Sequence, residues 1–173
     1  IAPVLRTLAP EGGLGISWTL TLFGCAGVAG TLLGGAASDR FGPQRTMQVL
    51  LLSLAGAMLL LPLTANHPGW MLAVLVTWGC SGFGLMSPQQ ARLAQMAPAQ
   101  APLLLSLNSS MLYLGTALGA AVGGPASQAV GFAHLTWVAA PFALAAWIVL
   151  MFVRPLAKPR AVPMSAPQED PSR

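Results

Sequence analysis

The stretch GAASDRFGPQR, residues 35–45, decides the fold, because it gathers one acid and two bases in a chain that has few charges. Residues 12–38, up to the acid Asp39, contain no Asp, Glu, Lys or Arg, and neither do residues 46–91 after the stretch. Each uncharged segment is long enough to hold a helix of about 20 residues that crosses a bilayer. The pattern therefore indicates a short charged loop between two membrane-spanning helices.

The composition supports a membrane protein. Of the 173 residues, 55% are hydrophobic and 7% are charged, whereas a soluble domain usually carries about 25% charged residues. This small number of charged groups is not enough to solvate a water-facing surface. The remaining apolar surface must therefore face lipid or other protein. The net charge of +4 is better explained by membrane orientation than by a nucleic-acid-binding patch.

Turn-forming residues divide the chain into five predicted transmembrane helices. Asn, Pro and Gly interrupt the long uncharged stretches at residues 66–70 and 123–132, and APAQAP at 97–102 precedes another apolar run. The apolar residues show no period-two alternation, so the strands of a membrane barrel are disfavoured. The expected fold is an all-α polytopic helix bundle, with helices over residues 14–38, 46–65, 69–91, 103–122 and 133–153.

The basic residues predict the orientation. If the charged loop is cytoplasmic, alternation of the spans places only Arg6 outside. Cytoplasmic loops of membrane proteins carry an excess of Lys and Arg, so this topology is preferred and the C-terminus is expected in the cytoplasm. The bases then inside are Arg40, Arg45, Arg92, Arg154, Lys158, Arg160 and Arg173.

The sequence also predicts a division into a transmembrane bundle, residues 1–154, and a tail, residues 155–173. In the tail a proline recurs at every fourth position from Pro155 to Pro171. Proline removes a helical hydrogen bond and clashes with the preceding turn, and the tail has little apolar bulk. We expect a disordered cytoplasmic extension.

Two sets of regularly spaced glycines predict close helix packing. Small residues let membrane helices approach each other, because lipid gives little hydrophobic drive for helix association. The sequence leaves open whether these faces pack statically or slide during function. The first set lies in the first predicted helix and the second in the fourth: Gly27, Gly30 and Gly34, and Gly115, Gly119 and Gly123.

Uncharged polar and aromatic side chains within the spans are candidates for lining a solute cavity: Trp78, Gln89, Asn108 and Tyr113. Hydrogen bonding between helices is the alternative. The predicted spans hold no Asp, Glu, Lys or Arg, so any proton-carrying carboxylate is expected elsewhere. No enzyme motif and no metal-ligand spacing is present, so we expect neither an enzyme nor a metal or other cofactor.

The charged stretch resembles the loop motif of the major facilitator superfamily, G-x-x-x-D-R/K-x-G-R-R/K. Pro43 stands where the stronger of the family's two copies has a base, and Gln44 also departs, which is typical of the copy between helices eight and nine. The segments WGCSGFGLMSPQQARLAQMAP and SLNSSMLYLGTALGAAVGG look like helices ten and eleven of the drug and sugar efflux members. The matching positions, with the remaining base, are Gly35, Asp39, Arg40, Gly42 and Arg45.

The resemblance implies the C-terminal part of a twelve-helix transporter, from the end of helix seven onward. Its implied partners are the N-terminal half of the same transporter, membrane lipid and a small-molecule substrate. Export by alternating access in exchange for protons is implied, with Asp39 as a gating latch that contacts the N-terminus of another helix. For Asp39 the alternative is a solvated loop acid.

Two alternatives for the whole chain stay open. A non-transporting membrane scaffold or assembly subunit would also contain packed glycine helices. The N-terminal half of a transporter is disfavoured by the degenerate loop and by the proline-rich end.

Overall fold

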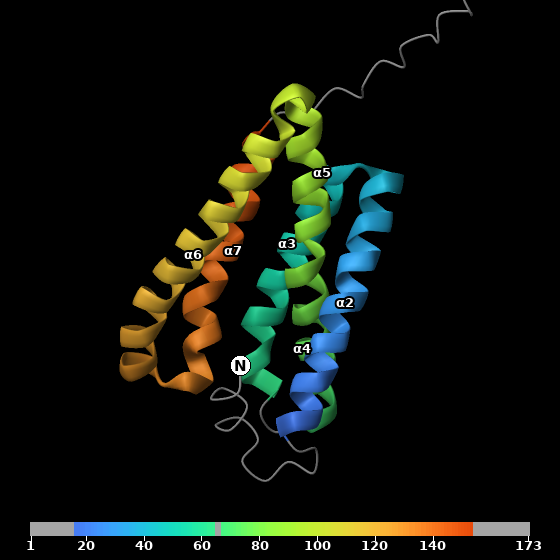
Figure 1. Ribbon diagram of the computed structural model, residues 1–173. Helices are drawn as coiled ribbons and strands as arrows, with labels where there is room; N and C mark the ends of the chain where they lie inside the picture. The colour runs from blue at the N-terminus through green and yellow to red at the C-terminus, as the bar shows by residue number, and fades with distance from the viewer. Residues whose placement is uncertain (1–15, 65–66, 154–173) are drawn as a thin grey trace, which may run out of the picture.

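A computed structural model describes residues 16–64 and 67–153 of the chain. This part of the chain is helical and contains no strand. Figure 1 shows its helices side by side as an up-and-down bundle. They are α2 (Ile16–Phe41), α3 (Pro43–Leu60), α4 (Pro68–Gly84), α5 (Met86–Met96), α6 (Ala101–Val130) and α7 (Leu135–Phe152), with short 3-10 turns at Leu61–Thr64, Pro98–Gln100 and Phe132–His134.

The predicted all-α bundle and its five spans are confirmed. Within residues 16–64 and 67–153, five helical segments are long and apolar enough to cross a membrane, and α4 and α5 together make the third of them. The predicted tail at 155–173 and the end of a preceding helix before residue 14 lie outside the described residues. The spans are Ser17–Phe41, Pro43–Thr64, Gly69–Met96, Pro98–Val130 and Leu135–Phe152.

The two helices on either side of the charged loop reach further into it than the charge pattern predicted. The helix α2 continues to Phe41 and α3 begins at Pro43, because proline is well suited to the first turn of a helix. The expected loop is thereby reduced to Gly42. As a result Asp39, Arg40, Arg45 and Arg92, which lie outside the predicted spans, fall within the ends of the observed spans.

The fourth span is also longer than predicted. A loop was expected over residues 123–132, but α6 remains helical to Val130 with Pro125 inside it. Glycine and proline break helices in water more readily than in membranes, where local adjustments satisfy the freed backbone groups. The chain turns only at Gly131, whose φ is 74°, a value that favours glycine.

The third span is interrupted at Leu85, between α4 and α5. The buried side chain of Pro88 explains the break. Proline cannot donate to the carbonyl four residues earlier, which is that of Gly84, and its ring clashes with that carbonyl. The interruption was not predicted, because the apolar pattern alone continues through it.

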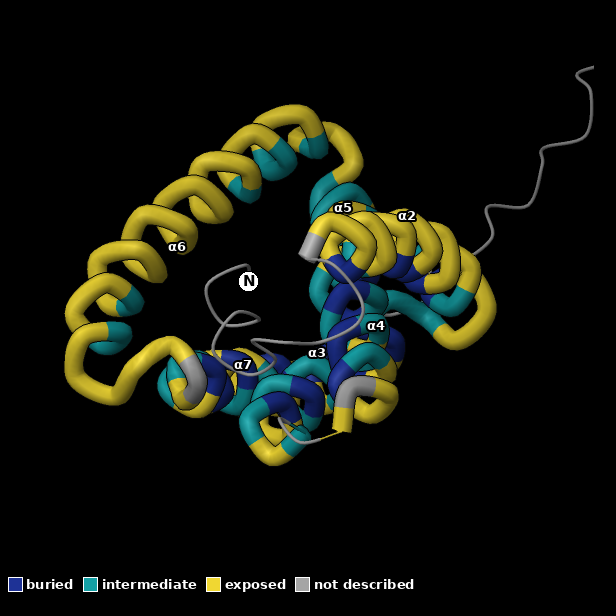
Figure 2. The backbone as a smooth tube through the Cα atoms, turned by 90° about the horizontal axis from the view of Figure 1, so that it is seen from below, coloured by how far each residue is buried: buried dark blue, intermediate teal, exposed yellow. Residues whose placement is uncertain are grey.

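The helices pack unevenly. The most extensive contacts join α2 to α4 and α3 to α7, whereas α6 meets α5 and α7 mainly near its ends. A small buried cluster of Met47, Leu51 and Leu150 holds α3 against α7. Figure 2 shows α6 exposed along its length, arching away from the other helices, and none of its residues is buried.

Candidate functional site

The α2–α3 junction, residues 38–46, is closed by a tight turn at Gly42. The amide of Gly42 donates to the carbonyl of Ser38 at 2.9 Å, and the amide and hydroxyl of Thr46 donate to the carbonyl of Gly42 at 3.2 and 3.0 Å. The φ of Gly42 is 88°, in a region that L side chains rarely adopt. The turn therefore requires glycine and holds the two spans in a fixed relation.

The charged side chains of the junction are exposed at one end of the bundle. Asp39 and Arg40 lie in the last turn of α2 and Arg45 in the first turn of α3, and the Arg40 guanidinium carbon lies 5.3 Å from the centroid of the Phe41 ring. Figure 1 places the junction at the same end of the bundle as the turn between α5 and α6. The Asp39 carboxylate is disfavoured where it lies, because the C-terminus of a helix carries partial negative charge.

Gln44 joins the junction to the C-terminal end of α7. Its side-chain amide donates to the carbonyl of Val153 at 2.8 Å and to that of Leu150 at 3.3 Å. The last carbonyls of a helix have no partner within the helix, so Gln44 caps α7. This contact was missed from the sequence, where Gln44 was only a departure from the motif, because no local pattern relates residues 106 positions apart.

Replacing Gln44 by Met keeps the size of the side chain but removes both hydrogen bonds. Each typical intramolecular hydrogen bond contributes about 1 kcal/mol, so we expect Gln44→Met to lower stability by about 1–2 kcal/mol. Denaturant titration of the purified protein measures the loss. Gln48→Met, one turn further along α3, is the matched control, and an equal effect of the two changes would contradict the cap.

The first glycine set lies against α4. A Cβ added at Gly30 would collide with the backbone of Cys80, 2.5 Å from its Cα, and one at Gly27 would lie 2.8 Å from Phe83 Cδ2. A Cβ at Gly34 would collide with the carbonyl oxygen of Gly84, the group that Pro88 leaves without its helical donor. The thiol of Cys80 also donates to the carbonyl of Ala26 at 3.1 Å, so α2 and α4 touch backbone to backbone.

The second glycine set is open. Within the described part of the chain, nothing lies within 4 Å of a Cβ built at Gly115, Gly119 or Gly123. The two glycine faces therefore do not meet each other here. Gly35, the first residue of the motif, packs closely against Ser87, whose Oγ would lie 3.1 Å from a Cβ added at Gly35.

The candidate cavity residues are only partly brought together. Gln89 of α5 donates to the side-chain oxygen of Asn108 of α6 at 3.5 Å, a long contact that links the two helices. Trp78 instead packs edge to face on Phe23 of α2, with ring centroids 5.8 Å apart. Tyr113 lies on the same helix as Asn108 and is 75% exposed.

Comparison with known proteins identifies the family. The family model described as Major Facilitator Superfamily matches residues 1–171. The chain is 32% identical to the inner membrane transport protein YdhP of Escherichia coli K12, over 89% of this chain and 40% of that protein. It is 32% identical to a chloramphenicol resistance protein of Streptomyces lividans, over 79% of this chain and 33% of the relative.

A third relative is a probable sugar efflux transporter of Mannheimia succiniciproducens, 25% identical over 78% of this chain and 34% of the relative. The chain thus spans between a third and two fifths of the length of these relatives. No solved structure gives a significant match.

Proposed function

Because the chain belongs to the major facilitator superfamily, we propose that it forms the C-terminal half of a secondary transporter that exports a small solute across the cell membrane. The other half is the N-terminal part of the same protein. Transport proceeds by alternating access, in which two halves rock around a central site, and protons enter in exchange. The charged junction and the C-terminus face the cytoplasm.

The α2–α3 junction is the observation that carries this proposal. It combines exposed charges of both signs, a glycine-only turn and a fixed attachment to α4 and α7 at one end of the bundle. A structural loop needs none of this charge, whereas a gate must be rigid on its own side and able to bind the opposite half. The relatives named for drug resistance and sugar efflux support export as the direction.

Asp39 is the proposed latch. Its carboxylate is exposed at the C-terminus of α2, where its own helix repels it. The N-terminus of a helix in the other half carries partial positive charge and would attract the Asp39 carboxylate. Arg40 and Arg45 accompany it as bases that favour the cytoplasmic side.

The packing suggests which helices move together. Gly27, Gly30 and Gly34 fix α2 to α4, and Gln44 fixes α3 to α7. We infer that these four helices move as one body during rocking. The Gly115, Gly119 and Gly123 face of α6 is then available to the N-terminal half.

Gln89 and Asn108 are the best-supported pair for the solute pathway, because both are uncharged amides at the boundary between α5 and α6. Trp78 and Tyr113 are weaker candidates, since Trp78 contacts α2 and Tyr113 is largely exposed. Among the described residues Asp39 is the single acid, and it lies at a helix end. The proton-carrying carboxylate is therefore proposed for the N-terminal half.

Drug resistance in an efflux-deficient host tests export. We expect the full-length reading frame to raise resistance to at least one compound of a panel that includes chloramphenicol and sugar analogues. A matched frame with Gln89→Leu and Asn108→Leu should lose that resistance while remaining in the membrane. Membrane-inserted protein that confers no resistance, together with a frame that lacks the six or seven further spans, would favour the scaffold alternative.

A further inference from the structure

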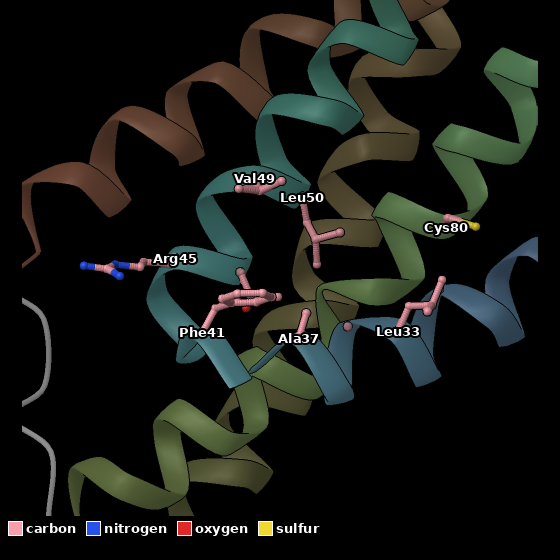
Figure 3. Close-up of a pocket in the computed structure, with 10 residues that line it drawn as sticks. Leu33, Ala37, Phe41, Arg45, Val49, Leu50 and Cys80 are labelled. Atoms are coloured by element: carbon pink, nitrogen blue, oxygen red, sulfur yellow. The ribbon is translucent and has the colours of Figure 1, made fainter. Parts of the chain in front are cut away.

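An apolar groove of about 470 Å³ runs beside the α2–α3 junction, with α4 behind it. The groove is distinct from the Gln89–Asn108 pair, which neither lines it nor comes from the same helices. Its walls are apolar side chains of α2 and α3, and its floor is the tight crossing of α2 and α4 at Gly30, Gly34 and Cys80. The principal wall residues are Leu33, Ala37, Phe41, Val49 and Leu50, as Figure 3 shows.

The wall residues that rim the groove are exposed. Leu33 is 64%, Phe41 58% and Val49 65% exposed, and all three lie within membrane spans. In a bilayer, apolar side chains at such positions are covered by lipid tails or by protein. The groove belongs to α2, α3 and α4, whereas α6, the helix with the open glycine face, mainly contacts α5 and α7, as Figure 2 shows.

The groove is charged at its junction end. Arg45 lines it, and Figure 3 shows its guanidinium directed away from the apolar side chains. Arg40 is exposed, with its guanidinium carbon 5.3 Å from the centroid of the Phe41 ring, and Phe41 is a wall residue. Arg45 thus lines the groove, and Arg40 lies beside its wall residue Phe41. Guanidinium groups match the phosphate of a lipid, and the apolar walls match its acyl chain.

We propose that this groove binds an anionic phospholipid, with one acyl chain between α2 and α3 and the phosphate at Arg40 and Arg45. Basic pockets between transmembrane helices favour anionic head groups, and guanidinium suits phosphate because it presents several donors. Asp39 lies beside Arg40 in the sequence, but Asp39, Arg40 and Arg45 together carry a net charge of +1. This net positive charge favours an anionic lipid over a neutral one. A bound lipid would sit against the gate and stabilise the junction.

Native mass spectrometry of the full-length protein in detergent, with phosphatidylglycerol, phosphatidylethanolamine and phosphatidylcholine added in equal amounts, tests the proposal. We expect phosphatidylglycerol to be retained preferentially. Arg40→Gln and Arg45→Gln should each lower that preference about fivefold, the effect of roughly one surface base near anionic lipid. Arg92→Gln, a base at the same end that does not line the groove, is the matched control.

A second pair of variants tests the apolar part. Val49→Trp fills the groove and should abolish retention of all three lipids, whereas Leu52→Trp, an exposed residue of the same helix outside the groove, should not. Equal retention of the three lipids, an Asp39-dependent preference for phosphatidylethanolamine, or unchanged binding by Val49→Trp would each overturn the proposal. Lipid retention is measured without transport, so this result stands independently of the export assay.

Discussion

Gly34→Ala should lower the stability of the protein by about 1–3 kcal/mol, the usual cost of overpacking a tight contact. In an open helix the same change would stabilise by about 1 kcal/mol, because alanine is the better helix former. At Gly34 the new methyl group meets the carbonyl of Gly84, with the Gly84 Cα at 3.0 Å. Both groups are backbone, so no side chain can move aside and the helices must separate.

Gly24→Ala is the matched control, because Gly24 lies in the same helix and nothing within the described residues comes within 4 Å of its added Cβ. Denaturant titration of the purified full-length protein should show opposite shifts for the two variants. Gly30→Ala should behave like Gly34→Ala, since it meets the Cys80 backbone. If Gly34→Ala were as stable as Gly24→Ala, the α2–α4 contact would not exist in the protein.

Asp39→Asn should separate stability from activity. Removing a negative charge from the C-terminus of α2 should raise stability by about 0.3–1 kcal/mol. The same change weakens a charge-assisted contact with the opposite half, so transport should fall about tenfold, which corresponds to ~1.4 kcal/mol. A solvated loop acid would give the first effect without the second.

The rates are compared in inverted membrane vesicles that contain equal amounts of inserted protein. Glu169→Gln, an acid-to-amide change in the predicted tail, is the control and should leave transport unchanged. Transport by Asp39→Asn at the wild-type rate would refute the latch.

The number and type of the membrane helices could be predicted from the sequence, because span length and charge spacing are set by the thickness of the bilayer. Helix ends could not. Asp39 and Arg40 were assigned to a loop although they belong to the last turn of α2, since a charge can end a hydrophobic run without ending the helix. Pro125 likewise marked a break in the pattern but lies inside α6.

The candidate site was predictable where it rests on local spacing and not where it rests on distant contacts. The spacing of Gly27, Gly30 and Gly34 marked one helix face, but only the structure shows that α4 covers it. Gln44 carried no signal, because its partners lie on α7. Of the candidate cavity residues, residue type suggested four, and the structure brings only Gln89 and Asn108 together.

Proton-driven uptake into inverted vesicles is the most direct test of the proposal that this chain is half of an exporter. The cytoplasmic face is then outside, so an acidic interior should drive the compound identified in the resistance screen into the vesicles. Full-length protein should accumulate it, and an uncoupler that collapses the gradient should abolish the accumulation. Uptake that is no greater than in vesicles without the protein, with or without the gradient, would contradict the proposal.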